Sequence, residues 1–377
     1  VISNSVNGQG NAFVGIGYTL DENNKIVSVK DAILGTYKNN YVQSKELMAN
    51  GGVIANYVES SKNNDIAQIG NIKADFSGNY VVSNKNNAYG GVISNFYVKS
   101  QNDYKNAIID SINGTFENNY AETKSTDVSK GAFGGAISNT ATIKAINNSI
   151  FRNNYAVSAN NTENKALGGA IYTKQDLTIN ADGGLTEFTG NYISTNGGAT
   201  KKYEAIYVDA GDKTLTLNAT TNGTTSGTIL LNDYINGVKG YNVSLTGDST
   251  STIKLYNNAD FKGGANVTVG DNIVIDTADG AVQNFSEINS LTSSANAKYN
   301  IDLVLSNASS SKLDYSVGEV ADGFITQTSS SGLVTLDNLK IITGSSDDLI
   351  NKNLKIQIIK NTDNTDNLQL ALSDKLT

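Results

Sequence analysis

The sequence predicts an all-β protein folded as a parallel β-helix, a solenoid of short stacked strands. Two motifs recur in alternation through the first half of the chain, at spacings of 34 to 44 residues. Internal repeats of this length are typical of solenoids. The segments between the motifs are short, rich in β-branched residues and alternate between apolar and polar side chains, as strands do. No stretch combines sustained helical apolar spacing with capping residues, which argues against helical repeats.

The first motif is an aromatic corner with the pattern F/Y-x-N/G-N-Y. It occurs five times, at Tyr37–Tyr41, Phe76–Tyr80, Phe116–Tyr120, Phe151–Tyr155 and Phe188–Tyr192. In stacked strands each corner recurs above the previous one, so its asparagine amides can hydrogen-bond in a ladder and its rings can fill the interior. We therefore predict a buried column of Phe76, Phe116, Phe151 and Phe188, with Asn79, Asn119, Asn154 and Asn191 at the adjoining corner.

The second motif is a glycine pair followed by a strand start, G-G-A/V-I. Its copies are Gly51–Ile54, Gly90–Ile93, Gly134–Ile137 and Gly168–Ile171; Val1–Asn4 matches the end of such a copy, and Ala205–Tyr207 is a decayed one. Glycine allows positive φ and close approach of backbones at a corner. We expect about two solenoid turns for each repeat. The mid-repeat start and the single methionine, Met48, indicate a processed or partial chain, so we expect a longer native molecule.

The stretches from each corner tyrosine to the next glycine pair vary in length. They are polar, for example "VQSKELMAN" after Tyr41 and "AETKSTDVSKGAF" after Tyr120. We interpret them as solvated turns. Insertions of variable length in a solenoid tend to collect on one face, which is often the binding face.

The pattern divides the chain into three segments. Residues 1–207 carry the motif repeats. Residues 208–290 continue as a degenerate β-helix, with alternating strands such as "KTLTLNA" but no regular motif. Residues 291–377 form a less regular, β-rich C-terminal segment that we predict caps the solenoid.

Composition excludes several classes of function. The formal net charge is −8 and the chain contains no histidine, cysteine, tryptophan or proline. An acidic chain lacks the clustered lysine and arginine that nucleic-acid binding needs, so we expect no nucleic-acid partner. Without histidine or cysteine, histidine-assisted nucleophiles, thiolate chemistry and Cys-ligated zinc are excluded. The absence of cysteine is compatible with export of an unfolded chain.

Carboxylates are the main route left for catalysis, and no pair of them is evident. Glycosidases need two carboxyl groups about 5–10 Å apart, whereas Asp103 and Asp110 in an extended strand would lie about 23 Å apart. The only arginine, Arg152, falls at a corner position that tolerates many residues and is expected to be solvated. The calcium-binding nonapeptide of β-rolls is absent. We therefore expect no enzyme activity, no catalytic, cofactor-binding or metal-binding residue, and no cofactor.

The alternating G-G-A/V-I and F-x-x-N motifs of residues 1–207 resemble the passenger domains of chlamydial polymorphic outer membrane proteins and related autotransporters. The resemblance implies a right-handed β-helix displayed at a bacterial outer membrane, often serving adhesion. A membrane β-barrel normally follows such a passenger, and this sequence carries no such segment. Membrane contact is therefore expected only through that missing segment.

Function is expected to be non-enzymatic contact outside the bacterial cell, at the cell surface or outer membrane. As an adhesin, the protein would bind glycans or proteins of a host or a neighbouring cell along its lateral face. As a structural surface protein, it would self-associate. The alternative is a β-helix enzyme that degrades polysaccharides, a lyase or hydrolase, because carboxylates brought together by neighbouring turns are invisible in the sequence.

Overall fold

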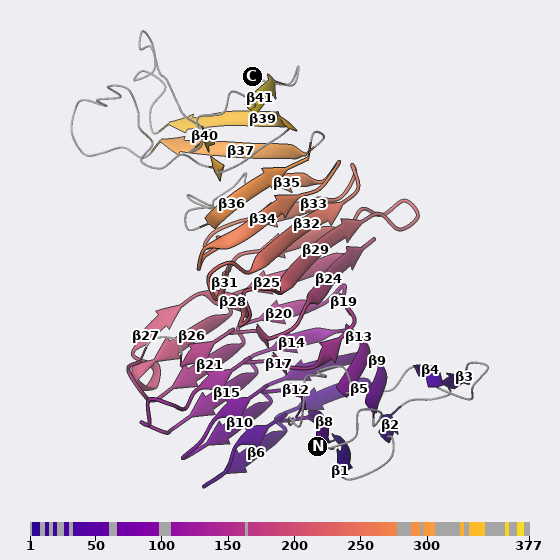
Figure 1. Cartoon of the computed structure of the whole chain (residues 1–377), viewed down its shortest axis with the longest axis vertical. Coiled ribbons are helices and arrows are strands. Elements are labelled where there is room, and N and C mark those ends of the chain that lie inside the picture. The colour runs from indigo at the N-terminus through magenta and orange to yellow at the C-terminus, as the bar shows by residue number, and fades with distance from the viewer. Residues whose placement is uncertain are drawn as a thin grey trace.

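The structure is a computed structural model that shows an elongated stack of β-strands, with the strands lying across the long axis (Figure 1). The N-terminal strands lie at one end of the stack and the C-terminal strands at the other. The structure describes residues 2–7, 12–14, 18–20, 26–29, 33–59, 66–97, 107–162, 165–276, 288–294, 297–305, 325–327, 332–343, 359–361 and 368–372. Within them the only helix is the single 3₁₀ turn Asn196–Gly198.

A seven-stranded parallel sheet forms one side of the stack. Its strands are β1 (Ile2–Asn7), β8 (Ile54–Glu59), β12 (Ile93–Tyr97), β17 (Ile137–Asn139), β23 (Ile171–Thr173), β28 (Glu204–Val208) and β31 (Tyr234–Gly237). Each motif repeat therefore contributes one strand to this sheet, beginning directly after its glycine pair.

Two shorter sheets occupy the stretches that follow each corner tyrosine. The six-stranded sheet consists of β6 (Tyr41–Ser44), β10 (Tyr80–Ser83), β15 (Tyr120–Thr123), β21 (Tyr155–Ser158), β26 (Tyr192–Thr195) and the antiparallel edge strand β27 (Thr200–Lys202). The four-stranded sheet consists of β7 (Ala49–Asn50), β11 (Ala88–Tyr89), β16 (Ala132–Phe133) and β22 (Ala166–Leu167).

A long parallel sheet runs the length of the stack as two ladders that share the continuous strand β9 (Ala67–Ser77). The first ladder contains β2 (Ala12–Val14), β13 (Ala107–Asn113), β18 (Thr142–Ile143), β19 (Ile146–Asn147), β24 (Leu177–Asp182), β29 (Thr214–Thr220), β32 (Asn242–Gly247), β34 (Ala265–Val269) and β36 (Ile288–Ser293). The second contains β5 (Ile33–Lys38), β14 (Thr115–Glu117), β20 (Ile150–Arg152), β25 (Leu185–Thr189), β30 (Thr228–Leu231), β33 (Thr252–Leu255), β35 (Val274–Asp276), β37 (Lys298–Leu305), β39 (Gly332–Thr343) and β41 (Leu368–Leu372). Two further pairs are the antiparallel β3 (Tyr18–Leu20) and β4 (Ile26–Val29) and the parallel β38 (Ile325–Gln327) and β40 (Ile359–Asn361).

Equivalent residues of successive repeats pair directly. The motif isoleucines form one register column: Ile2, Ile54, Ile93, Ile137, Ile171 and Ile206. The predicted matches are thereby confirmed for Ile2–Asn4 of the first copy, Val1 lying outside the described residues, and for Ile206 and Tyr207 of the decayed copy. The expectation of about two turns per repeat is wrong, because strands one repeat apart are immediate neighbours. The all-β, parallel architecture is compatible with a β-helix.

The predicted aromatic column is confirmed. Phe76, Phe116, Phe151 and Phe188 are buried, and consecutive rings stack with centroids 4.7 to 4.9 Å apart. Their β-strand positions repeat in register, so each ring covers the ring of the next repeat. Stacked rings that exclude water in this way contribute both area burial and ring–ring attraction.

The predicted asparagine corner is confirmed as a ladder. In Asn119, Nδ2 donates to Oδ1 of Asn154 at 2.9 Å and to the carbonyl of Phe76 at 3.1 Å. The backbone N–H of Asn119 also donates to Oδ1 of Asn154, at 3.1 Å. Each buried amide thus links three repeats, and the same bonds recur at Asn79, Asn154 and Asn191. A buried polar residue is tolerated because every donor and acceptor finds a partner.

The two glycines of each pair are needed for different physical reasons. The first has a positive φ, between +56° and +69° in the four copies, which side chains other than glycine adopt with difficulty. The second approaches backbone closely: a Cβ on Gly91 would lie 2.1 Å from the carbonyl oxygen of Gly135. The pair therefore brings the chain from the four-stranded sheet into the seven-stranded sheet without space for any side chain.

The variable stretches are only partly the solvated turns we expected. Each contains two strands, and between the six- and four-stranded sheets lies a small second core of alanine with a few larger aliphatics. Its members include the buried column Ala49, Ala88, Ala132 and Ala166. Small side chains let the two sheets approach closely. The extra length of some copies lies in the turns between the two strands.

The four-stranded sheet ends at Leu167 and the six-stranded sheet at Lys202, and the repeat shortens after both are lost. Ladder hydrogen bonds span 38 residues between Asn180 and Asn218, 28 between Asn218 and Thr246, and 24 between Asn242 and Asn266. The long sheet continues beyond this point with alternating buried and outward residues. The three predicted segments, with their boundaries at 207 and 290, stay predictions.

Candidate functional site

A groove lies on the lateral face of the stack, and small side chains form its floor. On the seven-stranded sheet, the residue after each motif isoleucine points away from the core. These residues are Ala55, Ser94 and Ser138 in successive repeats, followed by Tyr172 and Tyr207. Because Ser94 and Ser138 are small while Tyr172 and Tyr207 are large, the surface is hollow over β12 and β17 and filled further along.

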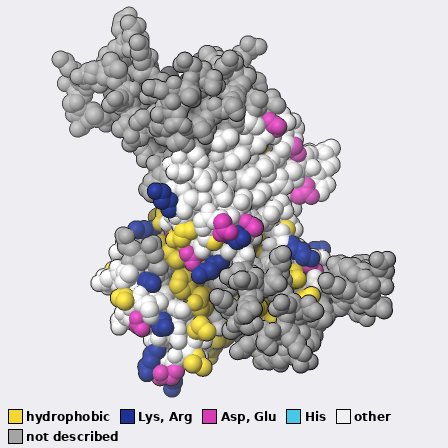
Figure 2. Space-filling model, viewed as in Figure 1, with side chains coloured by type: hydrophobic (Ala, Val, Ile, Leu, Met, Phe, Trp, Pro, Cys, Tyr) yellow, Lys and Arg dark blue, Asp and Glu magenta, His cyan; other side chains and the backbone are white. Residues whose placement is uncertain are grey.

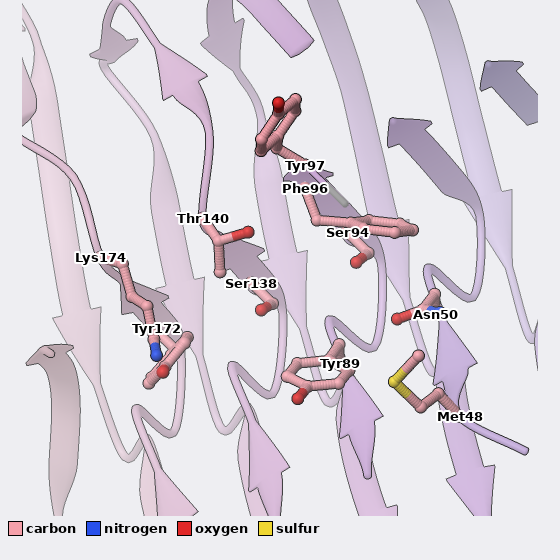
Figure 3. A pocket seen from close by; sticks show the side chains of 10 residues that line it. All are labelled: Met48, Asn50, Tyr89, Ser94, Phe96, Tyr97, Ser138, Thr140, Tyr172 and Lys174. Atoms are coloured by element: carbon pink, nitrogen blue, oxygen red, sulfur yellow. The ribbon is translucent and has the colours of Figure 1, made fainter. Parts of the chain in front are cut away.

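Aromatic side chains form the two walls of this groove, which we call the lateral groove. On one side, Tyr89 stacks on Phe133 with ring centroids 5.1 Å apart, both projecting from the four-stranded sheet. On the other, Phe96 stacks on Tyr57 with centroids 5.0 Å apart. Phe96 lies two residues after Ser94 and so projects from the same face of β12. In Figure 3, Ser94 lies between Tyr89 and Phe96, and Ser138 lies beside Ser94 on the neighbouring strand.

The two ends of the lateral groove differ. Met48 and Asn50 lie at one end, and Tyr172 and Lys174 close the other (Figure 3). At the closed end, the Tyr172 hydroxyl donates to Oδ2 of Asp209 at 2.5 Å, and Nζ of Lys174 lies 3.2 Å from the same oxygen. Burial, and then the negative charge of Asp209, raise the pKa of Tyr172 well above its ordinary value. This hydroxyl therefore stays protonated and acts as a fixed donor.

The groove encloses about 420 Å³, within the range of small-molecule sites. Its walls belong to a larger feature, because hydrophobic side chains gather in a stripe along the N-terminal half of this face (Figure 2). Leu167, Tyr172 and Tyr207 form a packed apolar cluster that continues from the closed end of the groove.

One polar atom in the floor lacks a partner. The Oγ of Ser94 is buried and makes no hydrogen bond, although the side chain lines the groove. A buried hydroxyl without a partner costs free energy that a bound hydrogen-bonding group would recover. The arrangement can therefore accept a ligand that combines apolar surface with at least one polar group.

A second cavity, of about 270 Å³, contains the fully buried carboxyl group of Glu204. Oε1 of Glu204 accepts the backbone N–H of Gly168 at 2.7 Å, and Oε2 accepts Nδ2 of Asn236 at 3.0 Å. Desolvation raises the pKa of this carboxyl group to about 7, although both hydrogen bonds and Lys202 lower it. Perturbed carboxyl groups in cavities are candidates for acid–base chemistry.

Glu204 takes the place of a backbone carbonyl that is present in the preceding repeat. In the preceding copy, the equivalent N–H of Gly134 donates to the carbonyl of Leu167 in the next strand of the four-stranded sheet. That sheet ends at β22, so Gly168 has no such carbonyl, and the side chain of Glu204 takes its place. The carboxyl group completes the hydrogen bonding of a sheet edge.

Asp233 has the same role at the end of the asparagine ladder. Its Oδ2 accepts the backbone N–H and the Nδ2 of Asn191, at 2.8 and 2.9 Å, and its Oδ1 accepts the N–H of Gly190 at 3.0 Å. Burial raises the pKa of Asp233 to about 6. Asp233 therefore ends the ladder with two acceptor oxygens, one for Asn191 and one for Gly190.

Of the residues considered for catalysis, the structure describes Asp110 and Arg152, and each of them forms an ion pair. Asp103 lies outside the described residues. Asp110 pairs with Lys144 and accepts Nε2 of Gln68 at 2.8 and 2.9 Å. Arg152, expected to be solvated, is half-exposed and forms a two-bond ion pair with Glu187, at 2.9 and 2.6 Å.

Sequence reasoning missed the lateral groove and the two buried carboxyl groups, although signals for them exist. The residue after the motif isoleucine changes from alanine and serine to tyrosine along the repeats, which marks where the groove ends. The stretch Leu231–Tyr234 is a sixth, shortened corner in which Asp233 stands for the asparagine. The shortening by one residue hid this match.

Comparisons with protein-family models, with curated proteins and with solved structures give no match to this chain. In the described part of the chain, no three acidic, histidine or cysteine side chains lie together as a metal site would require. The described residues likewise include no helix long and apolar enough to cross a membrane.

Proposed function

We propose that this chain is a right-handed parallel β-helix of the autotransporter-passenger type, displayed at the surface of a bacterial cell, that works by contact. Direct pairing of equivalent residues one repeat apart supports the β-helix. Right-handed connections between parallel strands are strongly favoured because of strand twist. The acidic composition and the absence of cysteine suit an exported, extracellular protein.

The observation that carries the contact function is the lateral groove with its aromatic walls. Its aromatic residues project outward from the seven- and four-stranded sheets, while the repeats are held together by the internal isoleucine and phenylalanine columns. A contiguous apolar patch that reaches the surface often marks a binding site. An adhesin that binds host or neighbouring-cell glycans or proteins is therefore favoured over a purely structural protein that self-associates.

The alternative, an enzyme that degrades polysaccharides, has less support. The two perturbed carboxyl groups, Glu204 and Asp233, each complete the hydrogen bonds of a backbone edge, so their burial has a structural reason. Incubation of the pure protein with pectins and mucin glycans should release neither reducing nor unsaturated sugar ends. Release that Glu204→Gln abolishes would establish the enzyme instead.

Attachment tests the contact function directly. Beads coated with the pure protein should adhere to layers of host or bacterial cells, and beads coated with albumin should not. Proteolytic shaving of intact producing cells should release peptides such as "NNSIF" (147–151). Beads that adhere no better than the albumin control would refute the adhesin, and recovery of the peptides only from the cytosol would refute surface display. Concentration-dependent sedimentation into large species without attachment would favour the structural role.

A further inference from the structure

This inference rests on the proposed contact function and concerns the ligand of the lateral groove. The chemistry of the groove lining selects a class of ligand. Among the described residues that line it, Lys174 alone carries a charge, and Asp209 neutralises that charge at 3.2 Å. A strongly anionic ligand such as a phosphate or a sulfated sugar would find no free cation there. The charge balance selects a neutral ligand.

The polar groups of the lateral groove exclude a purely apolar ligand. The buried Oγ of Ser94 has no hydrogen-bond partner, and an alkyl chain in the groove would leave it so. Thr140, Asn50 and Ser138 add further hydroxyl and amide groups to the lining. A ligand that fits must bring several hydrogen-bonding groups to the floor and rim.

The aromatic walls require apolar surface on the same ligand. Tyr89 and Phe96 flank the floor on opposite sides, and both are held in place by stacking on Phe133 and Tyr57. Walls held by stacking are rigid, so binding does not have to order them. Pyranose rings combine apolar C–H surfaces with hydroxyl groups, and those of neutral hexoses carry no charge.

We propose that the lateral groove binds a neutral pyranose unit of a glycan, with Ser94 hydrogen-bonding a sugar hydroxyl between Tyr89 and Phe96. The volume of about 420 Å³ suits a small ligand of this kind. Tyr172 ends the groove and so fixes how far the sugar extends towards the C-terminal repeats. An aromatic side chain of a partner protein would use the same walls but would bring at most one hydroxyl.

The test uses the pure protein on a printed array of neutral and anionic glycans, followed by affinity measurements with the best neutral glycan. In Ser138→Tyr a ring fills the floor, and the fold accommodates it because Tyr172 occupies the paired position in the next repeat. This variant should keep its melting temperature and lose binding at least tenfold. Ser94→Ala should bind about fivefold more weakly, as expected for one lost hydrogen bond, with an unchanged or higher melting temperature.

The matched control is Ser111→Ala, which removes a hydroxyl on the long sheet, bonded to Asn71 at 2.7 Å and outside the groove. It should bind like the native protein. Retention of anionic glycans only, retention of none, or full binding by a folded Ser138→Tyr would overturn the proposal. Binding of N-acetyltyrosinamide without binding of any sugar would also overturn it, because that result indicates a protein partner. If coated beads still adhere to cells in any of these cases, only the sugar-binding proposal is refuted, and the proposed contact function is retained.

Discussion

The carboxyl group of Glu204 accepts the backbone N–H of Gly168 at 2.7 Å, where the next strand of the four-stranded sheet would otherwise supply a carbonyl. Together with Asp233 at the end of the asparagine ladder, it closes the region where two of the sheets stop. Where two of the stacked sheets stop, backbone N–H groups lose their strand partners, and this chain satisfies them with acidic side chains.

The first prediction concerns pH. Burial raises the pKa of Glu204 to about 7, whereas an unfolded glutamate titrates near about 4.3. The folded state therefore holds this proton more tightly, so its stabilising effect is complete below about pH 4.3 and is lost as pH rises towards about 7. Relative to Glu204→Gln, the free energy of unfolding should fall by about 4 kcal/mol over that window. Urea titrations of both proteins at several pH values measure the difference; a difference independent of pH would contradict the assignment.

The second prediction concerns the end of the asparagine ladder. Asp233→Asn keeps one acceptor for Asn191, but its new amide cannot accept the N–H of Gly190. One buried donor is left unsatisfied, which should lower the free energy of unfolding by about 1–3 kcal/mol at pH 7. Asp212→Asn is the control, because that side chain is 79% exposed and should change stability by less than about 0.5 kcal/mol. Equal effects of the two substitutions would argue against a capping role for Asp233.

The third prediction concerns the aromatic column. Phe116 is fully buried between Phe76 and Phe151, so Phe116→Ala should cost about 3–5 kcal/mol. Phe188→Leu should cost less than about 1.5 kcal/mol, because Leu231 already follows Phe188 in the column. Thermal and urea unfolding measure both. Since repeats couple mainly to their neighbours, hydrogen exchange should show the loss near the substituted repeat.

The fourth prediction concerns the second glycine of the pair. In Gly91→Ala the new methyl group would lie 2.1 Å from the carbonyl oxygen of Gly135 and 2.5 Å from that of Tyr120. Backbone cannot move aside easily in a stacked array, so a cost of about 3 kcal/mol is expected. In the control Gly270→Ala, the nearest heavy atoms lie at 3.4 Å, an ordinary contact. A Gly91→Ala protein as stable as this control would contradict the close approach.

Much of the architecture followed from the sequence alone. The repeat spacing, the period-2 alternation and the motif residues predicted parallel strands, the column through Phe116 and the ladder through Asn119 correctly. They did so because a residue that repeats in register packs against the equivalent residue of the next repeat. The same contact or hydrogen bond therefore recurs along the stack. The right-handed β-helix, surface display and adhesion remain proposals.

Other features were decided only by the tertiary structure. The lateral groove exists because Ser94 and Ser138 lie level with aromatic side chains from a different sheet, and the sequence gives no distance between sheets. The polar stretches folded into strands around Ala88 and its copies, because burial by a neighbouring sheet outweighs their weak local preference. In the sequence, Glu204 and Asp233 cannot be told apart from other acidic residues. Only the tertiary structure buries them and places them against backbone N–H groups that have no carbonyl partner there.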